Sequence, residues 1–521
     1  MRKPKRDIQD IERFEEILSV LVREEAGYIL DRLDLEDRLP VAKRLTAKRQ
    51  AQPGPERLRQ TIEELGTTFI KFGQIMAERP DIVPERYAQE LQKLQDSAPP
   101  FPAEKAKEIV EAEVGLEEFD SFEEEPIAAA SIAQVHRAEL DGEEVVVKIR
   151  RPGMKKQVEK DLDILVFLAR RAEKHSDNLE KMGFVELVEE FSRWTRNELD
   201  LGRELKNAQI FRENLKDEDK LYVPEVYPEY STSEVLVMEY VDGVKCTDRQ
   251  EMEELDIDTE ELANTAVRAG MKQVVKDGFF HADPHPSNFL LRGDGTMVYL
   301  DFGMMGEVPK HLRDSIDLLL IHAMKEDSRK VLDVLKEMGT LSEDPELETI
   351  KHEIDRKILE MRNSSIGDTS ISRKLLELIW TCGRNGLYLP TSIALMGKNL
   401  VTMEGIGMTI CPGFEPSDEY RDYGKKLLME KNDPEEIAED VMLDIAENRD
   451  IVTRPATFLR EKMRDGTGGQ KVVKKVKKRD PLPTALVASS TLLMAGGLLD
   501  PLLFYAGIGE LGLGIYLHRK D

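Results

Sequence analysis

The clearest chemistry in the sequence lies between positions 281 and 303. His-Ala-Asp-Pro-His-Pro-Ser-Asn ends at Asn288, and an Asp-Phe-Gly segment begins at Asp301. An amide and a carboxylate oxygen are hard ligands that suit Mg²⁺ carrying nucleotide phosphates. Asp283, five positions before Asn288, can orient or deprotonate a hydroxyl group or a water molecule. D-x-x-x-x-N followed by D-F-G is typical of phosphoryl transfer in kinases.

A β-hairpin must bring these residues together. Apolar, β-prone runs at 289–291 and 297–300 flank the turn sequence Arg-Gly-Asp-Gly, whose Asp-Gly pair favours a tight hairpin. Asn288 precedes the first strand and Asp301 follows the second. Antiparallel pairing therefore predicts that their side chains converge on one metal ion.

The same segment admits a second interpretation, in which His281, Asp283 and His285 form a metal cluster, because His-x-x-x-His spacing places two imidazoles on one helical face. Pro284 and Pro286 argue against this, since proline prevents a regular helix across the motif. We therefore expect His281 to be a packed residue that supports the loop.

A positively charged residue is presented further upstream. A turn at Asp141-Gly142 leads into a β-branched run over 143–149 that carries Lys148, and a kinase needs such a lysine to neutralise phosphate charge. The alternative is a solvated lysine on an edge strand. A helix predicted over 185–215 carries three carboxylates, which on their own indicate a solvated surface. They are Glu198, Asp200 and Glu204.

The segment 127–136 is rich in alanine where a kinase carries a glycine-rich loop over the phosphates. Each alanine adds a Cβ that restricts backbone approach to phosphate, so this loop would grip a nucleotide differently. A small-residue turn at the start of a strand is the other interpretation. The candidate nucleotide-binding residues are Ala128, Ala129, Ala130 and Ser131.

The order of the segments predicts an α+β, bilobal, protein-kinase-like fold with helical additions. A helical stretch over 56–74 has apolar residues at helical spacing, and short β-type runs begin near Ala128. We predict an N-terminal helical extension (1–55), a helical element (56–104), a smaller lobe (105–243), a helical larger lobe (244–455), a basic linker (456–483) and an apolar helical hairpin (484–518).

Charge and cysteine content exclude several classes of protein. The net charge of −27 and a pI near 4.9 argue against a nucleic-acid partner, which would need a positive footprint. The three cysteines show no paired spacing for zinc or a redox couple, which fits a reducing, cytosolic setting. The N-terminus lacks the apolar run of a secretory signal.

Two apolar runs near the C-terminus, 484–499 and 502–517, are separated by Asp500-Pro501 and flanked on both sides by basic residues. Each is somewhat short of the roughly 20 residues that a spanning helix needs, and the alternative is a helical hairpin docked on the kinase core. Basic flanks on both sides predict a membrane hairpin with both ends, and the catalytic region, in the cytoplasm. Its glycines would allow helix contacts within the hairpin or between two chains of a homodimer.

Several motifs together resemble those of the UbiB family of atypical protein-kinase-like proteins. They are K-F-G-Q, the loop A-A-A-S-I-A-Q-V-H, V-V-V-K, E-L-D, H-A-D-P-H-P-S-N and D-F-G, which occur in family order over about 56–306. The resemblance implies that Lys148 pairs with Glu204 and that Asp283 is the catalytic-loop aspartate. It also implies that Asn288 and Asp301 hold the metal.

The resemblance implies further roles for other parts of the chain. Lys71, Gly73 and Gln74 would lie on a family-specific helix over the site, facing Glu198 and Asp200, while the hinge at the adenine would include Glu239, Tyr240 and Val241. Ala133 departs from the glycine that many relatives place in the alanine-rich loop.

The activity implied is that of an ATPase that uses ATP or ADP with Mg²⁺ and supports isoprenoid-quinone biosynthesis, with a membrane lipid, isoprenoid or quinone precursor as partner. The alternatives are a phosphotransferase acting on a protein or small-molecule hydroxyl and a nucleotide-binding scaffold without turnover.

Overall fold

The structure is a computed structural model that describes residues 10–24, 33, 35, 54–77, 79, 83–94, 98–176, 179–180, 183–255, 257–363, 370–416, 419–420 and 422–423. The chain divides into two units, Met1–Gly424 and Lys425–Asp521, and every described residue belongs to the first. The predicted linker 456–483 and apolar hairpin 484–518 lie outside the described residues. Among the helices that are described, none is both long enough and apolar enough to cross a bilayer.

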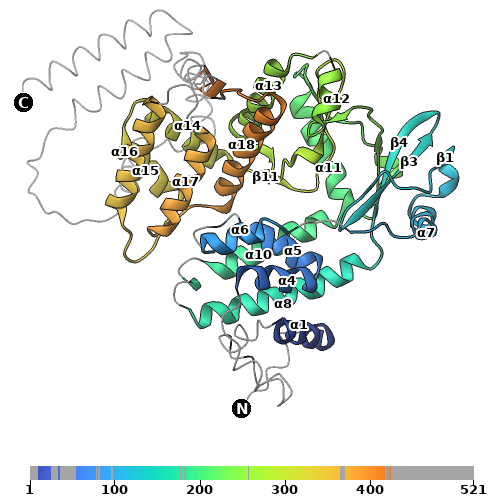
Figure 1. The fold of residues 1–521 in the computed structure, drawn as a ribbon, viewed down its shortest axis with the longest axis horizontal. Coiled ribbons are helices and arrows are strands. Elements are labelled where there is room, and N and C mark those ends of the chain that lie inside the picture. Colours follow the sequence, from blue (N-terminus) through green and yellow to red (C-terminus); the bar gives the residue numbers. More distant parts are fainter. Residues whose placement is uncertain are drawn as a thin grey trace, which may run out of the picture. The chain divides into compact units, whose positions relative to one another are not determined.

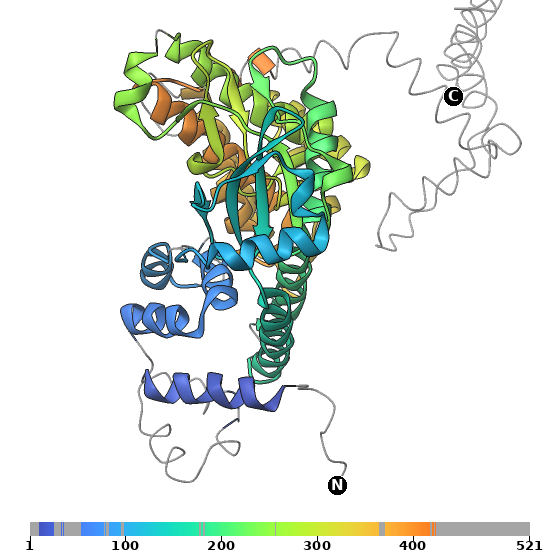
Figure 2. The ribbon, with the colours of Figure 1, turned by 90° about the vertical axis from the view of Figure 1, so that its right-hand side faces the viewer.

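The smaller lobe is an antiparallel sheet with strand order β1-β3-β4-β6, to which β2 adds by pairing with β3. The Asp-Gly turn between β3 and β4 forms as predicted, with Asp141 and Gly142 at φ 52° and 79°, the left-handed values that a tight hairpin turn requires. Helix α7 (Ala103–Glu113) packs Ala106 and Val110 on the core face of β4. Figure 2 shows this helix lying across the sheet. The strands are β1 (Ser121–Phe122), β2 (Ala128–Ala129), β3 (Ala133–Leu140), β4 (Glu143–Arg150) and β6 (Val235–Glu239).

The larger lobe is mainly helical and contains the predicted hairpin. Strands β9 (Phe289–Leu291) and β10 (Met297–Tyr299) pair antiparallel, with Tyr299 opposite Phe289, and β5 (Leu221–Tyr222) and β7 (Val244–Lys245) flank them. The hairpin prediction is therefore confirmed. Two short pairs complete the described strands, with β8 (Phe279–His281) against β11 (Met305–Glu307) and β12 (Thr340–Leu341) against β13 (Leu387–Tyr388).

The helices of this lobe gather around α18 (Figure 1). Gly270 of α13 would place a Cβ 3.1 Å from Met403 of α18, so the two helices pack very closely at this glycine. The helices are α12 (Arg249–Glu254), α13 (Thr259–Met271), α14 (Lys310–Met324), α15 (Ser328–Met338), α16 (Leu347–Asn363), α17 (Ile371–Arg384) and α18 (Thr391–Ile410).

A third group of helices shares its own apolar core and is visible below the two lobes in Figure 1. Asp161, only 1% exposed, ties the group together. It accepts hydrogen bonds from Arg13 at 2.8 Å and from Thr68 at 3.0 Å. The members are α1 (Ile11–Arg23), α4 (Pro55–Leu65), α5 (Thr67–Ala77), α6 (Glu85–Leu91), α8 (Met154–Lys174) and α10 (Phe184–Glu198).

Two helices that the sequence predicts as continuous are broken in the structure. The stretch 56–74 divides into α4 and α5 at Gly66, whose φ of 97° is outside the helical region. The stretch 185–215 divides into α10 and α11 (Leu201–Leu215). Asp200 adopts an extended backbone there and caps α11 by accepting a hydrogen bond from Gly202, as N-cap residues do. The spacing of apolar residues alone does not reveal either break.

Candidate active site

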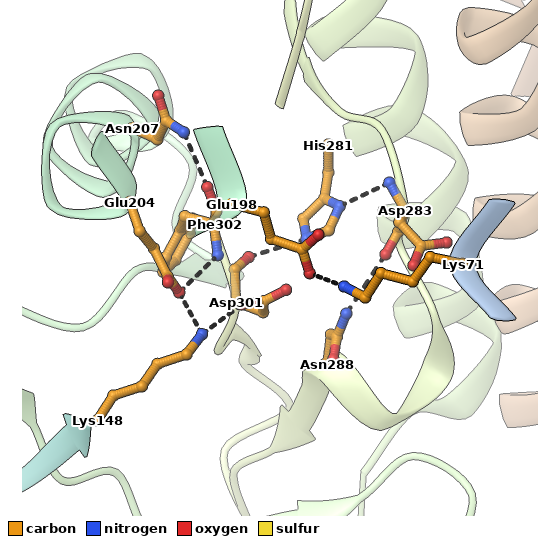
Figure 3. A network of polar contacts seen from close by, with 10 residues as sticks. All are labelled: Lys71, Lys148, Glu198, Glu204, Asn207, His281, Asp283, Asn288, Asp301 and Phe302. Atoms are coloured by element: carbon orange, nitrogen blue, oxygen red, sulfur yellow. Dashed lines mark hydrogen bonds and ion pairs between the residues drawn. The ribbon is translucent and has the colours of Figure 1, made fainter. Parts of the chain in front are cut away.

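Lys148 joins the two lobes through an ion-paired cluster (Figure 3). Its Nζ lies 2.6 Å from Glu204 Oε1 and 2.7 Å from Asp301 Oδ1. Because β4 lies between β3 and β6, Lys148 is on a central strand, and the edge-strand alternative is wrong. The cluster brings together three of the predicted site residues from β4, α11 and the segment after β10.

The electrostatics of this cluster are dominated by burial and by close charges. Burial alone would lower the pKa of Lys148, but the carboxylates of Asp301 and Glu204 outweigh it and raise that pKa above its usual range. Burial raises the pKa of Glu204 to about 7 against the opposing pull of Lys148. Burial would also raise the pKa of Asp301, yet the Lys148 ammonium holds it below its ordinary value. Asp301 is therefore the carboxylate of the two that ionises more readily.

Helix α11 also fixes the Asp-Phe-Gly segment. Glu204 Oε1 accepts a hydrogen bond from the Phe302 amide at 3.3 Å, and Asn207 donates to the Phe302 carbonyl at 2.9 Å. Phe302 itself is fully buried. The surface-charge interpretation therefore fails for Glu204, which is only 3% exposed.

His281 supports the loop, as predicted. Its Nε2 lies 2.8 Å from the Asp301 carbonyl, and its Nδ1 accepts a hydrogen bond from the Asp283 amide at 3.1 Å. The Asp301 carbonyl can only accept, so Nε2 carries the proton and the ring is neutral. With both nitrogens engaged, His281 has no lone pair for a metal, and the His281–Asp283–His285 cluster does not form.

A neutral, buried histidine makes stability depend on pH. Burial lowers the pKa of His281 below 6.5, so the unfolded chain binds a proton first as pH falls. The free energy of unfolding should therefore decline below about pH 6.5, by up to about 1.4 kcal/mol per pH unit. In His281→Gln this contribution should vanish, giving a shallower slope in denaturant unfolding at pH 7.5, 6.5 and 5.5. His311→Gln, exposed on α14, is the matched control, and equal slopes in His281→Gln and wild type would contradict the prediction.

Asp283 has a partner that the sequence did not reveal. Lys398 of α18 lies with its Nζ 3.0 Å from Asp283 Oδ1. Burial would raise the pKa of Asp283, but the Lys398 ammonium lowers it, which keeps the carboxylate ionised. Lys398 is 115 positions away in a helix without any recognisable motif, and no local pattern could have identified it.

Asn288 lies at the end of a short 3₁₀ turn. The Leu300 amide donates a hydrogen bond to the Asn288 carbonyl at 3.0 Å. The Asn288 Nδ2 donates to the Asp283 carbonyl at 3.3 Å. With its nitrogen engaged in this way, the amide oxygen is the Asn288 atom left for a ligand. Two oxygen donors of this kind fit Mg²⁺, which prefers carboxylate and carbonyl ligands.

Helix α5 approaches the site from the third group of helices. Lys71 forms an ion pair with Glu198, the last residue of α10 (Figure 3). A Cβ at Gly73 would lie 2.6 Å from Leu94 Cδ1, so glycine permits close packing there. Gln74 donates to the Leu94 carbonyl at 3.1 Å.

The resemblance placed both Glu198 and Asp200 opposite this helix. Glu198 makes the contact, whereas Asp200 is the N-cap of α11. The two acidic residues therefore have different structural roles.

The alanine-rich loop is a small β-hairpin. Ala128 and Ala129 form β2 against β3, and the Ala130 amide donates to the Ala133 carbonyl at 2.8 Å. Ser131 is 3% exposed, and its Oγ has no hydrogen-bond partner.

The predicted hinge begins where β6, a strand of the smaller lobe's sheet, ends. Glu239 ends β6 and accepts a hydrogen bond from the Tyr222 hydroxyl at 2.6 Å. The Tyr240 ring stacks under Arg137, with the guanidinium carbon 4.2 Å from the ring centroid, and Val241 is buried. The side chain of Glu239 is thus used internally, which leaves main-chain groups as the available contacts for a base.

Comparison with known protein families gives two matches along this chain. Residues 93–335 match the ABC1 atypical kinase-like domain, and residues 354–415 match the UbiB helical domain. Lys398 lies in the second of these regions, and the rest of the ion-paired site, apart from Lys71, lies in the first.

Individual proteins are similar over most of the chain. A probable protein kinase UbiB of Pseudomonas fluorescens is 32% identical over 88% of this chain and 89% of its own length. One of Azotobacter vinelandii is 35% identical over 71% of this chain and 70% of its own. The chloroplastic Arabidopsis thaliana protein ACTIVITY OF BC1 COMPLEX KINASE 8 is 34% identical. The match covers 71% of this chain and about half, 54%, of the length of that relative.

Among solved structures, the complex of Rv3197 with erythromycin from Mycobacterium tuberculosis matches at 24% identity, with a TM-score of 0.42. The match covers 69% of this chain and 95% of that one.

Proposed function

Because the chain belongs to the UbiB family of ABC1 atypical kinase-like proteins, we propose that it binds ATP with Mg²⁺ and hydrolyses it. We propose further that this activity supports isoprenoid lipid or quinone synthesis at a membrane. The observation that carries the proposal is the cluster in which Lys148 contacts Glu204 and Asp301. In the kinase template, the same three residue types hold the nucleotide phosphates and the metal.

Each site residue has a role in this proposal. Lys148, positioned by Glu204, would neutralise charge on the nucleotide phosphates, and Asn288 and Asp301 would hold Mg²⁺. Bound Mg²⁺ would supply charge compensation at the phosphate oxygens. Asp283 is kept ionised by Lys398, so it is able to accept a proton from an attacking water or to orient that water.

Water is favoured as the phosphoryl acceptor by the position of α5. Glu198, the partner of Lys71, lies against the Asp-Phe-Gly segment, since a Cβ at Gly303 would be 3.4 Å from Glu198 Cγ. We propose that this ion pair takes up space that a protein substrate would need to reach Asp283. A water molecule needs far less room than a peptide hydroxyl.

Phosphate release by the purified full-length protein tests the proposal. We expect release that requires Mg²⁺ and that increases with lipid vesicles, with Asp301→Asn as the negative control. Undiminished release in Asp301→Asn would remove that residue from the metal site and contradict the proposal.

A phosphotransferase acting on a hydroxyl is the second candidate, because an ionised Asp283 serves an alcohol as well as water. Product analysis with γ-labelled ATP separates the candidates. Free phosphate supports hydrolysis and a labelled acceptor supports transfer. Nucleotide binding without either product would indicate a scaffold.

A further inference from the structure

A large cavity lies between the third group of helices, which includes α5, and the helices of the larger lobe. Its volume is about 790 Å³, and its walls come from α5, α6 and α10 on one side and from α16, α17 and α18 on the other. This volume lies in the range of small-molecule binding pockets, about 300–1,000 Å³. None of the residues expected to hold the nucleotide or the metal is among its lining residues.

The lining of this cavity is basic although the protein is acidic. The chain has 102 acidic and 75 basic residues, yet six lining residues are basic and three are acidic. Within the lining, Glu353 pairs with Arg356 at 2.6 Å and Glu377 pairs with Lys357. The other basic lining residues are Arg79, Arg373, Arg384 and Lys398, of which Lys398 pairs with Asp283. A cavity with this balance favours an anion.

The cavity also offers apolar and aromatic surface. The two tryptophans of the protein, Trp194 of α10 and Trp380 of α17, both line it. Leu187, Leu376 and Leu395 extend the apolar surface. Basic groups together with tryptophan and leucine side chains suit a compound with an anionic head and an apolar body.

Lys398 connects this cavity to the candidate active site. It lines the cavity, and its ammonium contacts Asp283 at 3.0 Å. Its side chain is 24% exposed and that of Asp283 is 47% exposed, so a ligand head can reach the pair. An anion near Lys398 would compete with the Asp283 carboxylate for the same ammonium.

We infer that this cavity binds an amphiphile with an apolar body and a phosphate head, and that the head shares Lys398 with Asp283. Binding alone does not require ATP turnover. The consequence for Asp283 rests on the function proposed above. Since the two anions share one cation, occupancy of the cavity and the hold of Lys398 on Asp283 are thermodynamically coupled.

Tryptophan fluorescence gives a direct test, because both tryptophans of the full-length chain line the cavity. Monomeric dodecyl phosphate should change the emission saturably. Dodecyl maltoside, which has the same chain without the charge, and inorganic phosphate, which has the charge without the chain, should not. An unchanged emission with dodecyl phosphate would overturn the inference, as would an equal response to either control compound.

Variants of the shared ion pair test the coupling in the same titration. Lys398→Met should weaken dodecyl phosphate binding by about tenfold, because a charge-assisted hydrogen bond is lost, and Lys398→Arg should retain most of the affinity. Asp283→Asn should tighten binding by about fivefold, since the competing carboxylate is removed. In the double variant Lys398→Met/Asp283→Asn, the second substitution should have no further effect.

Lys336→Met is the matched control, because Lys336 pairs with Asp333 on α15 and does not line the cavity. If Lys398→Met and Lys398→Arg both bind dodecyl phosphate with the wild-type affinity, the proposed role of Lys398 is wrong. Because the readout needs no nucleotide, a protein that binds dodecyl phosphate but releases no phosphate from ATP would refute the proposed function and leave this inference standing.

Discussion

Replacing Lys148 with methionine is expected to reduce phosphate release by about 10²- to 10³-fold, the typical cost of removing one preorganised charge from a reacting centre. Methionine retains the length and apolar stem of lysine but leaves Glu204 and Asp301 without their common cation. We expect the loss in kcat, measured at saturating ATP. A kcat within twofold of the wild-type value would contradict the assignment of Lys148 to the phosphates.

The same substitution should also destabilise the fold, and a second substitution separates the two effects. Breaking a buried ion pair by removing one partner costs about 3–5 kcal/mol, because a charge remains buried without compensation. Glu204→Gln in the Lys148→Met background removes one such charge, so it should restore much of the free energy of unfolding without restoring phosphate release. If both properties recovered together, the lysine would be structural only.

The pH dependence of this variant follows from the carboxylates. Burial already raises the pKa of Glu204 to about 7 in the presence of Lys148, and removal of the ammonium raises it further. An acid whose pKa is raised by folding contributes stability at low pH that is lost as pH increases above its unfolded value, about 4.3. The stability deficit of Lys148→Met relative to wild type should therefore be larger at pH 8 than at pH 5.

Replacing Phe211 with alanine is expected to cost about 3–5 kcal/mol of unfolding free energy. Phe211 of α11 is fully buried, and its ring centroid lies 4.9 Å from that of Tyr299 and 5.9 Å from that of Phe302. Alanine would leave a cavity between α11, the β9–β10 hairpin and the Asp-Phe-Gly segment. Urea unfolding monitored by circular dichroism measures the change.

Two matched variants define the result for Phe211. Phe211→Leu keeps most of the volume and should cost less, about 1–1.5 kcal/mol. Ile210→Ala is adjacent on the same helix, but Ile210 is 47% exposed, so the change should stay within about 0.5 kcal/mol. Equal losses in Phe211→Ala and Ile210→Ala would show that helix propensity, rather than core packing, sets the stability there.

The parts of the site that lie close together in sequence were predictable. The turn after Arg292 fixes the β9–β10 hairpin, and the hairpin fixes Asn288 relative to Asp301 through strand pairing alone. Lys148 was predictable as a residue at the end of a β-branched run. Its pairing with Glu204, 56 positions away, depended on likeness to a family, because apolar spacing says nothing about which carboxylate of α11 points inward.

Features set by tertiary contact were not predictable. The family resemblance assigned Asp200 a place facing the helix of Lys71, yet its side chain caps the first turn of α11. Lys398 occupies an ordinary position of an apolar helix, and its importance appears only when α18 is placed against the loop that carries Asp283. Which charged residues pair over such long separations depends on tertiary packing. It produces no periodic pattern in the sequence.

Helix α18 has a consequence for how the enzyme matures. Asn399 donates a hydrogen bond to the His281 carbonyl across 118 positions of chain, next to the contact between Lys398 and Asp283. Contacts of such high sequence separation form late because their loop-closure entropy must be paid first. During synthesis, a chain that has emerged only as far as the Asp-Phe-Gly segment would lack these two supports, so competence for turnover should arise only once α18 has left the ribosome and docked.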